Sequence, residues 1–304
     1  MEGGSKIGEG AHGVAYDLCL ADNDSFCDIV DKLDVKKVTI YTSDEKKVIS
    51  LEEFSKFIHR RGKFFVKIIK EKGTFSLSHA ASEFREEIKA HRIVSSVLDS
   101  GMYTFDKDLI GAHIEGSKTI YAVFGNKCNS NYEVKNIKKY AKDILEILVI
   151  LNETHLHNDV KSDNVVRCGT KYKLIDWGAV SDLDHPSSRT SKTTSPMKVY
   201  LEYGFAFVTK TIFTKKVDAA TKKMPEFQEQ YKRIMNEFQE NIDKYSKRDL
   251  IKKYYGTHDV FQLGMTLLIL VLERNLNYDK VKDIIDKMIS LNNPITAKEA
   301  ISLF

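Results

Sequence analysis

The sequence predicts an α+β protein whose first part is rich in strands and whose second part is mainly helical. Three short apolar runs in the first part, at residues 6–20, 38–41 and 64–69, are typical of strands. Further along the chain, apolar residues recur at three- and four-residue steps, as they do on helices. The length of 304 residues suits one unit with two lobes as well as two independent domains.

One helix of the first part, predicted at residues 82–98, carries an acidic side chain on its packing face. Its register places four residues on that face, namely Phe84, Glu87, His91 and Val94. A competing face carries Glu86 together with Ala90, Ile93 and Val97. The pattern favours Glu87 as the inward carboxylate and leaves Glu86 open. Residues 119–124 then read as the last strand of this part.

Helical patterns account for most of the second part. Apolar spacing predicts a helix over residues 134–152, whose apolar side chains belong to the core. A second pattern predicts an amphipathic helix of roughly five turns with one packing face. That face is formed by Phe227, Tyr231, Ile234, Met235, Phe238, Ile242 and Tyr245. The apolar run at residues 263–272 is too short to cross a bilayer, so it predicts a buried helix.

Polar residues suited to phosphoryl transfer lie close together near the middle of the chain. Residues 157–164 read HNDVKSDN, and residues 174–178 read LIDWG. Phosphoryl transfer depends on positioning and charge neutralisation. It needs one carboxylate to orient the attacking hydroxyl, and a second carboxylate plus an amide to hold metal ions. Asp159, Asp176 and Asn164 have the types and the order for these three roles.

Two upstream features supply what this chemistry still lacks. Residues 7–16 read IGEGAHGVAY, in which three glycines at G-x-G-x-x-G spacing let backbone amides approach phosphate oxygens. Lys67, within the apolar run 64–69, can present its ammonium to the same phosphates. Each feature alone is weak, because such glycines often form an ordinary turn and a strand lysine often only extends into solvent. The prediction of phosphoryl transfer depends on both features occurring in the same chain, in this order, before the downstream motifs.

The four features in this order resemble the signature set of the eukaryotic-type protein kinase family, of the serine/threonine type. The resemblance implies a bilobal protein-kinase-like fold, with a small β-rich N-lobe containing one main helix and a larger, mainly helical C-lobe. Residues 1–304 would form a single kinase domain, with the N-lobe at 1–124 and the hinge and C-lobe at 125–304. Two segments depart from the family pattern as insertions, at about 19–61 and about 205–258.

In the C-lobe, the resemblance assigns a catalytic loop. Asp159 would orient the acceptor hydroxyl and take its proton, while Lys161 would steady the moving phosphoryl group. Asn164 and Asp176 would hold Mg²⁺ beside the phosphates of ATP. Asp259, at the start of a helix that resembles the central helix of this lobe, would brace the backbone of the loop.

In the N-lobe, the resemblance assigns the residues that meet ATP from the other side. Lys67 would position the phosphates and would be kept in place by Glu87 as its ionic partner. The expected ATP-binding set in the N-lobe consists of Gly8, Glu9, Gly10, Gly13 and Lys67. In the C-lobe, Asn164 and Asp176 complete this set.

Two residues of the motif region refine the expected activity. Lys161 argues for serine/threonine acceptors rather than tyrosine, and it disfavours a small-molecule acceptor. Asn158 stands where kinases switched by activation-loop phosphorylation usually have arginine, and its amide has no positive charge to pair with a phosphate on the loop 179–199. The sequence therefore predicts constitutive activity.

Two alternatives remain open at this stage. A pseudokinase that binds nucleotide or serves as a scaffold is favoured by the missing Ala-Pro-Glu motif at the end of the activation segment, for which residues 200–202 are a loose substitute. A kinase of small molecules is the weaker alternative.

Composition gives expectations about the partners and the location of the protein. A net charge of +4, spread along the chain, gives no support to specific nucleic-acid binding. The four cysteines show no C-x-x-C spacing, so we expect reduced thiols in an intracellular, cytoplasmic protein. The composition is also similar to that of divergent kinases of large DNA viruses, which would place the protein in the host cytoplasm or the virion. Protein substrates, no membrane span and a monomeric state complete these expectations.

Overall fold

The computed structural model describes residues 6–10, 13–18, 25–60, 64–69, 77–116, 119–126, 128–129, 132–183 and 218–304. The chain divides into two compact units, Met1–Asn129 and Ser130–Phe304. Its architecture is mixed α+β with an antiparallel sheet, as the sequence predicts. The segments 184–199 and 200–202, to which the activation-loop expectations refer, lie outside the described residues, as do residues 205–217 of the second predicted insertion.

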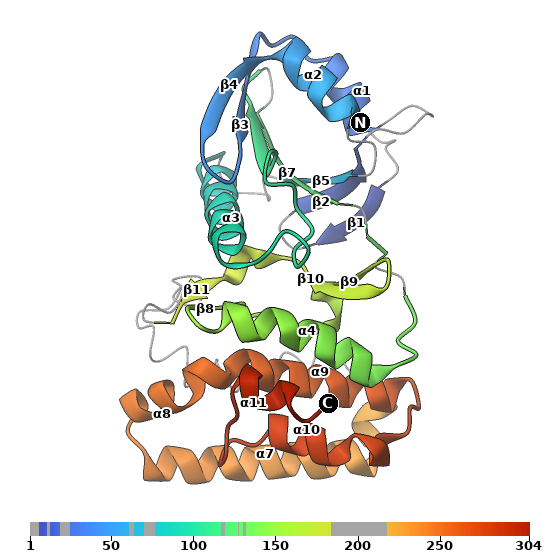
Figure 1. The fold of residues 1–304 in the computed structure, drawn as a ribbon, viewed down its shortest axis with the longest axis vertical. Helices are drawn as coiled ribbons and strands as arrows, with labels where there is room; N and C mark the ends of the chain where they lie inside the picture. Colours follow the sequence, from blue (N-terminus) through green and yellow to red (C-terminus); the bar gives the residue numbers. More distant parts are fainter. Residues whose placement is uncertain are drawn as a thin grey trace. The chain divides into compact units, whose positions relative to one another are not determined.

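The first unit is built on a seven-stranded antiparallel sheet with the strand order β1-β2-β5-β7-β6-β3-β4 (Figure 1). The strands are β1 (Lys6–Gly10), β2 (Gly13–Asp17), β3 (Lys37–Tyr41), β4 (Lys46–Ser50), β5 (Phe64–Ile69), β6 (Gly111–Ile114) and β7 (Ile120–Asn126). Each of the four apolar runs read from the sequence coincides with strands in its described residues, the first of them with both β1 and β2. Two further strands, β4 and β6, have no such run, because β4 is largely exposed and β6 is short and begins with glycine and alanine.

Two helices from the predicted insertion at 19–61 cover one face of this sheet. They are α1 (Phe26–Asp31) and α2 (Leu51–His59), and each begins with a capping box, formed by Ser25 with Asp28 and by Ser50 with Glu53. Their apolar side chains belong to one core with the sheet, in which the Phe26 and Phe124 rings meet edge to face at 5.7 Å. The described part of the insertion is therefore integral to the core of the first unit.

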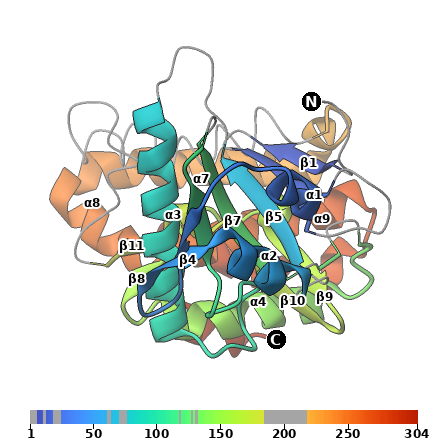
Figure 2. The same ribbon diagram turned by 90° about the horizontal axis from the view of Figure 1, so that it is seen from above.

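The opposite face of the sheet is covered by α3 (Leu77–Val97), as Figure 2 shows from above. Phe84 of α3 packs against Tyr41 of β3 and Tyr121 of β7, with ring centroids 5.2 Å apart in both pairs. A Cβ atom at Gly111 would lie 2.5 Å from Cδ1 of Ile88 and 2.9 Å from Cε2 of Phe84. The close approach of α3 to β6 therefore requires glycine at this position.

The second unit is mainly helical, with two short two-stranded sheets (Figure 1). Its described residues form the α-helices α4 (Ile137–Leu151), α7 (Pro225–Lys244), α8 (Lys247–Tyr254), α9 (His258–Glu273), α10 (Lys282–Met288) and α11 (Ala297–Ile301). The paired strands are β8 (His155–Leu156) with β11 (Ser181–Asp182), and β9 (Val165–Cys168) with β10 (Lys171–Leu174). Helix α9 contacts α4, α10 and α11, so it forms the centre of this unit.

Helix α9 confirms the buried helix predicted at residues 263–272. Within the described residues, one segment, Tyr255–Glu273, is long and apolar enough to cross a membrane, but 83% of its apolar window is buried inside the protein. A core helix passes the same test of length and composition, so this segment is no evidence for a membrane span.

Helix α7 confirms the amphipathic helix, but its packing face differs from the predicted one. Tyr231 and Met235 were expected on that face, yet they are 37% and 36% exposed. The buried side of the helix includes two polar residues that an apolar pattern does not detect. The Gln230 amide donates to the Tyr278 hydroxyl at 3.1 Å, and the Asn241 amide donates to Asn292 at 2.7 Å.

The cysteines correct another expectation. Cys27, Cys128 and Cys168, the cysteines that the structure describes, are all disulfide-bonded rather than reduced. Spacing along the sequence does not reveal which cysteines a fold brings together, and this was the basis of the expectation. The cysteines therefore give no argument for a reducing compartment.

Candidate functional site

In the first unit, the structure brings Lys67 and Glu87 together. The Lys67 ammonium on β5 donates to both carboxylate oxygens of Glu87, at 2.9 and 3.0 Å. Side-chain exposure is 21% for Lys67 and 7% for Glu87, whereas Glu86 is exposed. Glu87 is thus the carboxylate that contacts the strand lysine. A half-buried ammonium held this way by one carboxylate is oriented for binding an anion.

The glycine motif forms part of the antiparallel pair β1–β2. Gly8 and Glu9 lie in β1, and the pair closes with Gly10 opposite Gly13. Ala11 and His12, between these two glycines, lie outside the described residues. Since β2 also pairs with β5, with Ala15 opposite Lys67, the second strand of the glycine motif runs beside the lysine strand.

In the second unit, two predicted catalytic residues and one predicted metal ligand meet at one carboxylate oxygen. Oδ2 of Asp159 accepts a hydrogen bond from the Asn164 amide at 2.7 Å, and a second one from the Lys161 ammonium. The Asn164 amide also donates to the backbone carbonyl of Asp159 at 2.9 Å. These contacts fix the carboxylate in one orientation although it is 37% exposed. An oriented and accessible carboxylate is what a general base requires.

Asp176 lies next to Asn164 along the backbone of the β9–β10 pair. Leu174 pairs with Val165 at the end of this pair, and the Ile175 amide then donates to the Asn164 carbonyl at 2.9 Å. Asp176 follows directly, in the left-handed backbone region with φ of 61°. A carboxylate and an amide oxygen are ligands that Mg²⁺ accepts when phosphates and water complete its octahedron. Because the side-chain nitrogen of Asn164 donates to Asp159, its side-chain oxygen would be the metal ligand. This oxygen and the Asp176 carboxylate fit the ligand preference of Mg²⁺.

His157 connects the predicted catalytic loop to the segment that carries Asp176. Its ring is fully buried and packs on Trp177, with centroids 4.8 Å apart. The Asp159 amide donates to Nδ1 at 3.3 Å, which leaves Nε2 as the protonated nitrogen that donates to the Ile175 carbonyl at 3.2 Å. As a lone histidine it reads as a packing residue in the sequence, but here it fixes two segments of the site against each other.

The buried carboxylate of Asp259, in the first turn of α9, braces the backbone of the predicted catalytic loop, as expected. It is fully buried and accepts three hydrogen bonds. Oδ2 accepts from the His157 amide at 2.7 Å and from the Asn152 side chain at 2.8 Å, while Oδ1 accepts from the Asn158 amide at 2.8 Å. A buried carboxylate is stable only with such donors, so loop and helix depend on each other.

Two further residues of α9 hold the loop and were missed in the sequence. Gln262 accepts from the Val160 amide at 2.8 Å and donates to the Asn158 carbonyl at 3.0 Å. Thr266 donates to the Val160 carbonyl at 3.2 Å. Together with Asp259 they form a polar stripe at i, i+3 and i+7 on an otherwise apolar helix, and that spacing is the signal that could have identified them.

Asn158 ties the loop to the beginning of the segment that follows Asp176. Its backbone is left-handed, with φ of 64°, and its side-chain nitrogen donates to the Ala179 carbonyl at 2.9 Å and to the Ser181 hydroxyl at 2.8 Å. Ser181 also contacts the Tyr255 hydroxyl at 2.8 Å, and that hydroxyl donates to the Asp182 carbonyl at 2.6 Å. All of these groups are uncharged, so the anchor needs no phosphate.

His258 makes the stability of the second unit depend on pH. Burial lowers the pKa of its imidazole below the ordinary value of 6.5, although the carboxylates of Asp259 and Asp159 act in the opposite direction. Since the folded protein then binds fewer protons than the unfolded chain, the free energy of unfolding is expected to decrease as the pH falls below about 6.5. Urea unfolding between about pH 7.5 and about pH 5.5 would measure this decrease.

The control for this pH effect is His258→Gln, which cannot titrate. Its free energy of unfolding is expected to change less over the same pH interval than that of the unsubstituted protein. His155→Gln is a comparison variant. Burial also lowers the pKa of His155, but this histidine is half-exposed, whereas His258 is buried. An unchanged slope in His258→Gln would contradict the assignment to His258.

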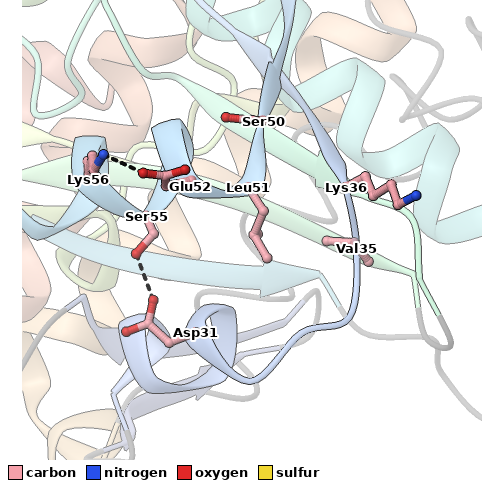
Figure 3. Close-up of a pocket in the computed structure, with 8 residues that line it drawn as sticks. All are labelled: Asp31, Val35, Lys36, Ser50, Leu51, Glu52, Ser55 and Lys56. Atoms are coloured by element: carbon pink, nitrogen blue, oxygen red, sulfur yellow. Dashed lines mark hydrogen bonds and ion pairs between the residues drawn. The ribbon is translucent and has the colours of Figure 1, made fainter.

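A surface pocket of about 550 Å³ in the first unit contains none of the predicted site residues (Figure 3). It lies between α1, β4 and α2, and three of its four charged side chains have contacts within the pocket lining. The Ser55 hydroxyl donates to Asp31 at 2.6 Å, and Lys56 pairs with Glu52 at 2.5 Å. These contacts are those of a solvated surface, and they assign no chemistry to the pocket.

Two comparisons with known proteins give no match. No protein-family model matches this chain, and a search of curated proteins finds no significant relative. Among the described residues, no group of three or more His, Cys, Asp or Glu side chains is placed to hold a metal ion by itself. Any cation bound at Asn164 and Asp176 would therefore take the rest of its ligands from its substrate or from water.

Proposed function

We propose that this chain is an ATP-dependent protein kinase that transfers the γ-phosphate of ATP to serine or threonine hydroxyls, and that its two units are the lobes of a bilobal protein-kinase-like fold. One observation carries the proposal. Oδ2 of Asp159 is held by both Lys161 and Asn164, so a general base, a cation for the phosphoryl group and a metal ligand lie in one cluster. The braced loop and the Lys67–Glu87 pair support the same function.

The residues of the second unit would act on the acceptor and on the phosphoryl group. The Asp159 carboxylate accepts a hydrogen bond from the acceptor hydroxyl, aligns its oxygen with the γ-phosphorus and takes its proton as the new O–P bond forms. The bond between the γ-phosphorus and the oxygen bridging to ADP breaks in the same step. Lys161 neutralises charge on the group in transfer. Mg²⁺, held by Asn164 and Asp176, would neutralise the phosphate oxygens of ATP.

Lys67 would bind the phosphates of the same nucleotide. Its ammonium is fixed by Glu87, so binding an anion there costs little additional ordering of the side chain. Backbone amides near Gly8, Gly10 and Gly13 would cover the phosphates. The meeting of these groups with Asp159 and Asp176 around one nucleotide is part of the proposal.

The test is transfer of radiolabelled γ-phosphate from ATP to a generic basic protein with Mg²⁺ present. We expect label on phosphoserine and phosphothreonine after acid hydrolysis, and loss of labelling with EDTA. Asp159→Asn, prepared in parallel, controls for contaminating kinases. No transfer by the unsubstituted protein, combined with measurable ATP binding, would support a pseudokinase instead, and label on phosphotyrosine alone would contradict the acceptor class.

Asn158 predicts the response of this activity to phosphatase. Because uncharged hydrogen bonds to Ala179 and Ser181 anchor the beginning of the activation segment, dephosphorylated protein is expected to keep its turnover number within roughly twofold. The measurement compares kcat before and after phosphatase treatment, with mass spectrometry to verify that phosphate has been removed. A large decrease in kcat would show that the segment depends on a phosphate elsewhere.

A further inference from the structure

We propose that the β3–β4 hairpin is a built-in brace for α3, and that Arg92 is the positioning residue through which it keeps Glu87 against Lys67. The inference rests on the proposed function, because it concerns the regulation of the same phosphate-binding lysine. It assigns a role to the described part of the segment at 19–61, which departs from the pattern of the kinase family.

One row of residues across the sheet connects the hairpin to the lysine. Tyr41 pairs with Gly111, Gly111 with Val123, and Val123 with Lys67, so all four side-chain positions lie on the same face. Helix α3 lies on that face. Its residues meet the row at both ends, because Phe84 packs on Tyr41 and Glu87 pairs with Lys67. The position of α3 over β3 therefore also sets the position of Glu87 over β5.

Arg92 fastens α3 to the tip of the hairpin. Its Nε donates to the Thr42 carbonyl at 3.0 Å and its Nη2 donates to the Glu45 carbonyl at 2.7 Å. Two donors in a rigid planar group hold two acceptors in a fixed geometry, which a lysine ammonium cannot reproduce. These contacts lie little more than one helical turn beyond Glu87, since five residues correspond to roughly 7.5 Å along a helix.

The hairpin tip has hydrogen bonds of its own besides those to Arg92. The Thr42 amide donates to the Glu45 carbonyl at 2.9 Å, and the Thr42 hydroxyl accepts from the Glu45 amide at 3.0 Å. The Ser43 amide donates to the Lys107 carbonyl at 2.8 Å. The Thr42 hydroxyl also donates to the Glu45 carbonyl at 3.2 Å, so Arg92 adds a donor to an oxygen that the hairpin tip already holds in place. Because the acceptors are already fixed, the contact can position the helix rather than merely follow it.

The consequence is a Lys67–Glu87 pair that needs no separate activating protein. A helix whose glutamate must reach a strand lysine can control that lysine by moving. Here the hairpin belongs to the same sheet as Lys67, so a contact between the hairpin and α3 also fixes Glu87 relative to Lys67. Loss of the Arg92 contacts would free α3 to move relative to the sheet, although Lys67 and Glu87 themselves would not be substituted.

The test uses Arg92→Ala, with Arg85→Ala as the matched control, because Arg85 is an exposed arginine of the same helix. The first readout is acetylation of the Lys67 ammonium by acetic anhydride, measured by mass spectrometry, which requires no kinase activity. We expect roughly threefold faster modification of Lys67 in Arg92→Ala and no change in Arg85→Ala. Glu87→Gln shows the effect of losing the ionic partner itself.

The second readout is phosphoryl transfer. In Arg92→Ala, kcat/KM for ATP is expected to decrease about tenfold, with Arg92→Lys in between. If the alanine variant does not fold, Arg92→Lys replaces it as the test variant, because lysine keeps the positive charge. Equal Lys67 modification in Arg92 and Arg85 variants would overturn the brace. If the unsubstituted protein transfers no phosphate, faster modification in Arg92→Ala alone would still establish it, so the two proposals fail separately.

Discussion

Replacing Asp159 with asparagine is expected to decrease kcat for phosphoryl transfer by roughly 10²- to 10⁴-fold. Asparagine has nearly the same shape but cannot accept the proton of the acceptor hydroxyl. It also removes the negative charge that Lys161 now contacts. Since Asp159 is 37% exposed, the substitution is expected to leave the free energy of unfolding almost unchanged. The loss would therefore belong to the chemical step.

Two measurements separate this explanation from a general loss of structure. The dissociation constant for ATP with Mg²⁺ should stay within a few-fold of that of the unsubstituted protein, because Asp159 acts on the acceptor and not on the nucleotide. Asp163→Asn makes the same substitution at an exposed position of the same loop and should keep nearly full activity. Equal activity of Asp159→Asn and the unsubstituted protein would exclude Asp159 as the base.

The motifs were readable because phosphoryl transfer, the reaction that we propose, demands certain residue types in a certain order. HNDVKSDN and LIDWG predict a carboxylate, a lysine and an amide in one place, and Asp159, Lys161 and Asn164 do meet at a single oxygen. The helical register at 82–98 favoured Glu87, and Glu87 is the carboxylate that contacts Lys67. Short-range periodicity was sufficient there, because one turn of a helix decides which of two neighbours faces the sheet.

Contacts between distant segments could not be predicted in the same way. The support from Gln262 and Thr266 depends on hydrogen bonds to a loop about a hundred residues earlier in the chain. Strands β4 and β6 are formed by pairing with neighbours rather than by an apolar pattern of their own. The cysteine expectation was wrong for a related reason, since a disulfide depends on proximity in the fold and not on spacing in the sequence.

Asp259→Ala is expected to lower the free energy of unfolding of the second unit by roughly 3–5 kcal/mol, the largest stability effect that we predict. The carboxylate is fully buried and accepts from the amides of His157 and Asn158 and from the Asn152 side chain. Alanine would leave the two backbone amides without an acceptor where water is largely excluded, whereas the Asn152 side chain would lose one of its two acceptors and keep the His155 carbonyl at 3.1 Å. Each such donor costs about 1–3 kcal/mol when it stays unpaired.

Trp177 provides the signal for this measurement. It is the single tryptophan of the chain, it is 1% exposed, and its ring packs on His157, whose amide is one of the three donors. Urea unfolding followed by its fluorescence therefore reports on the catalytic loop and its surroundings. Asp283→Ala, at an exposed aspartate of the same unit, should change the free energy of unfolding by no more than about 0.5 kcal/mol.

Asp259→Asn distinguishes a role of charge from a role of acceptor number. The amide keeps one acceptor oxygen but turns its nitrogen toward a donor. The free energy of unfolding is therefore expected to fall by more than in Asp283→Ala and by less than in Asp259→Ala. Catalysis should decrease in the same order, because His157 and Asn158 immediately precede Asp159 and their backbone would no longer be fixed. Full stability of Asp259→Ala, with unchanged kcat, would mean that α9 does not hold the loop.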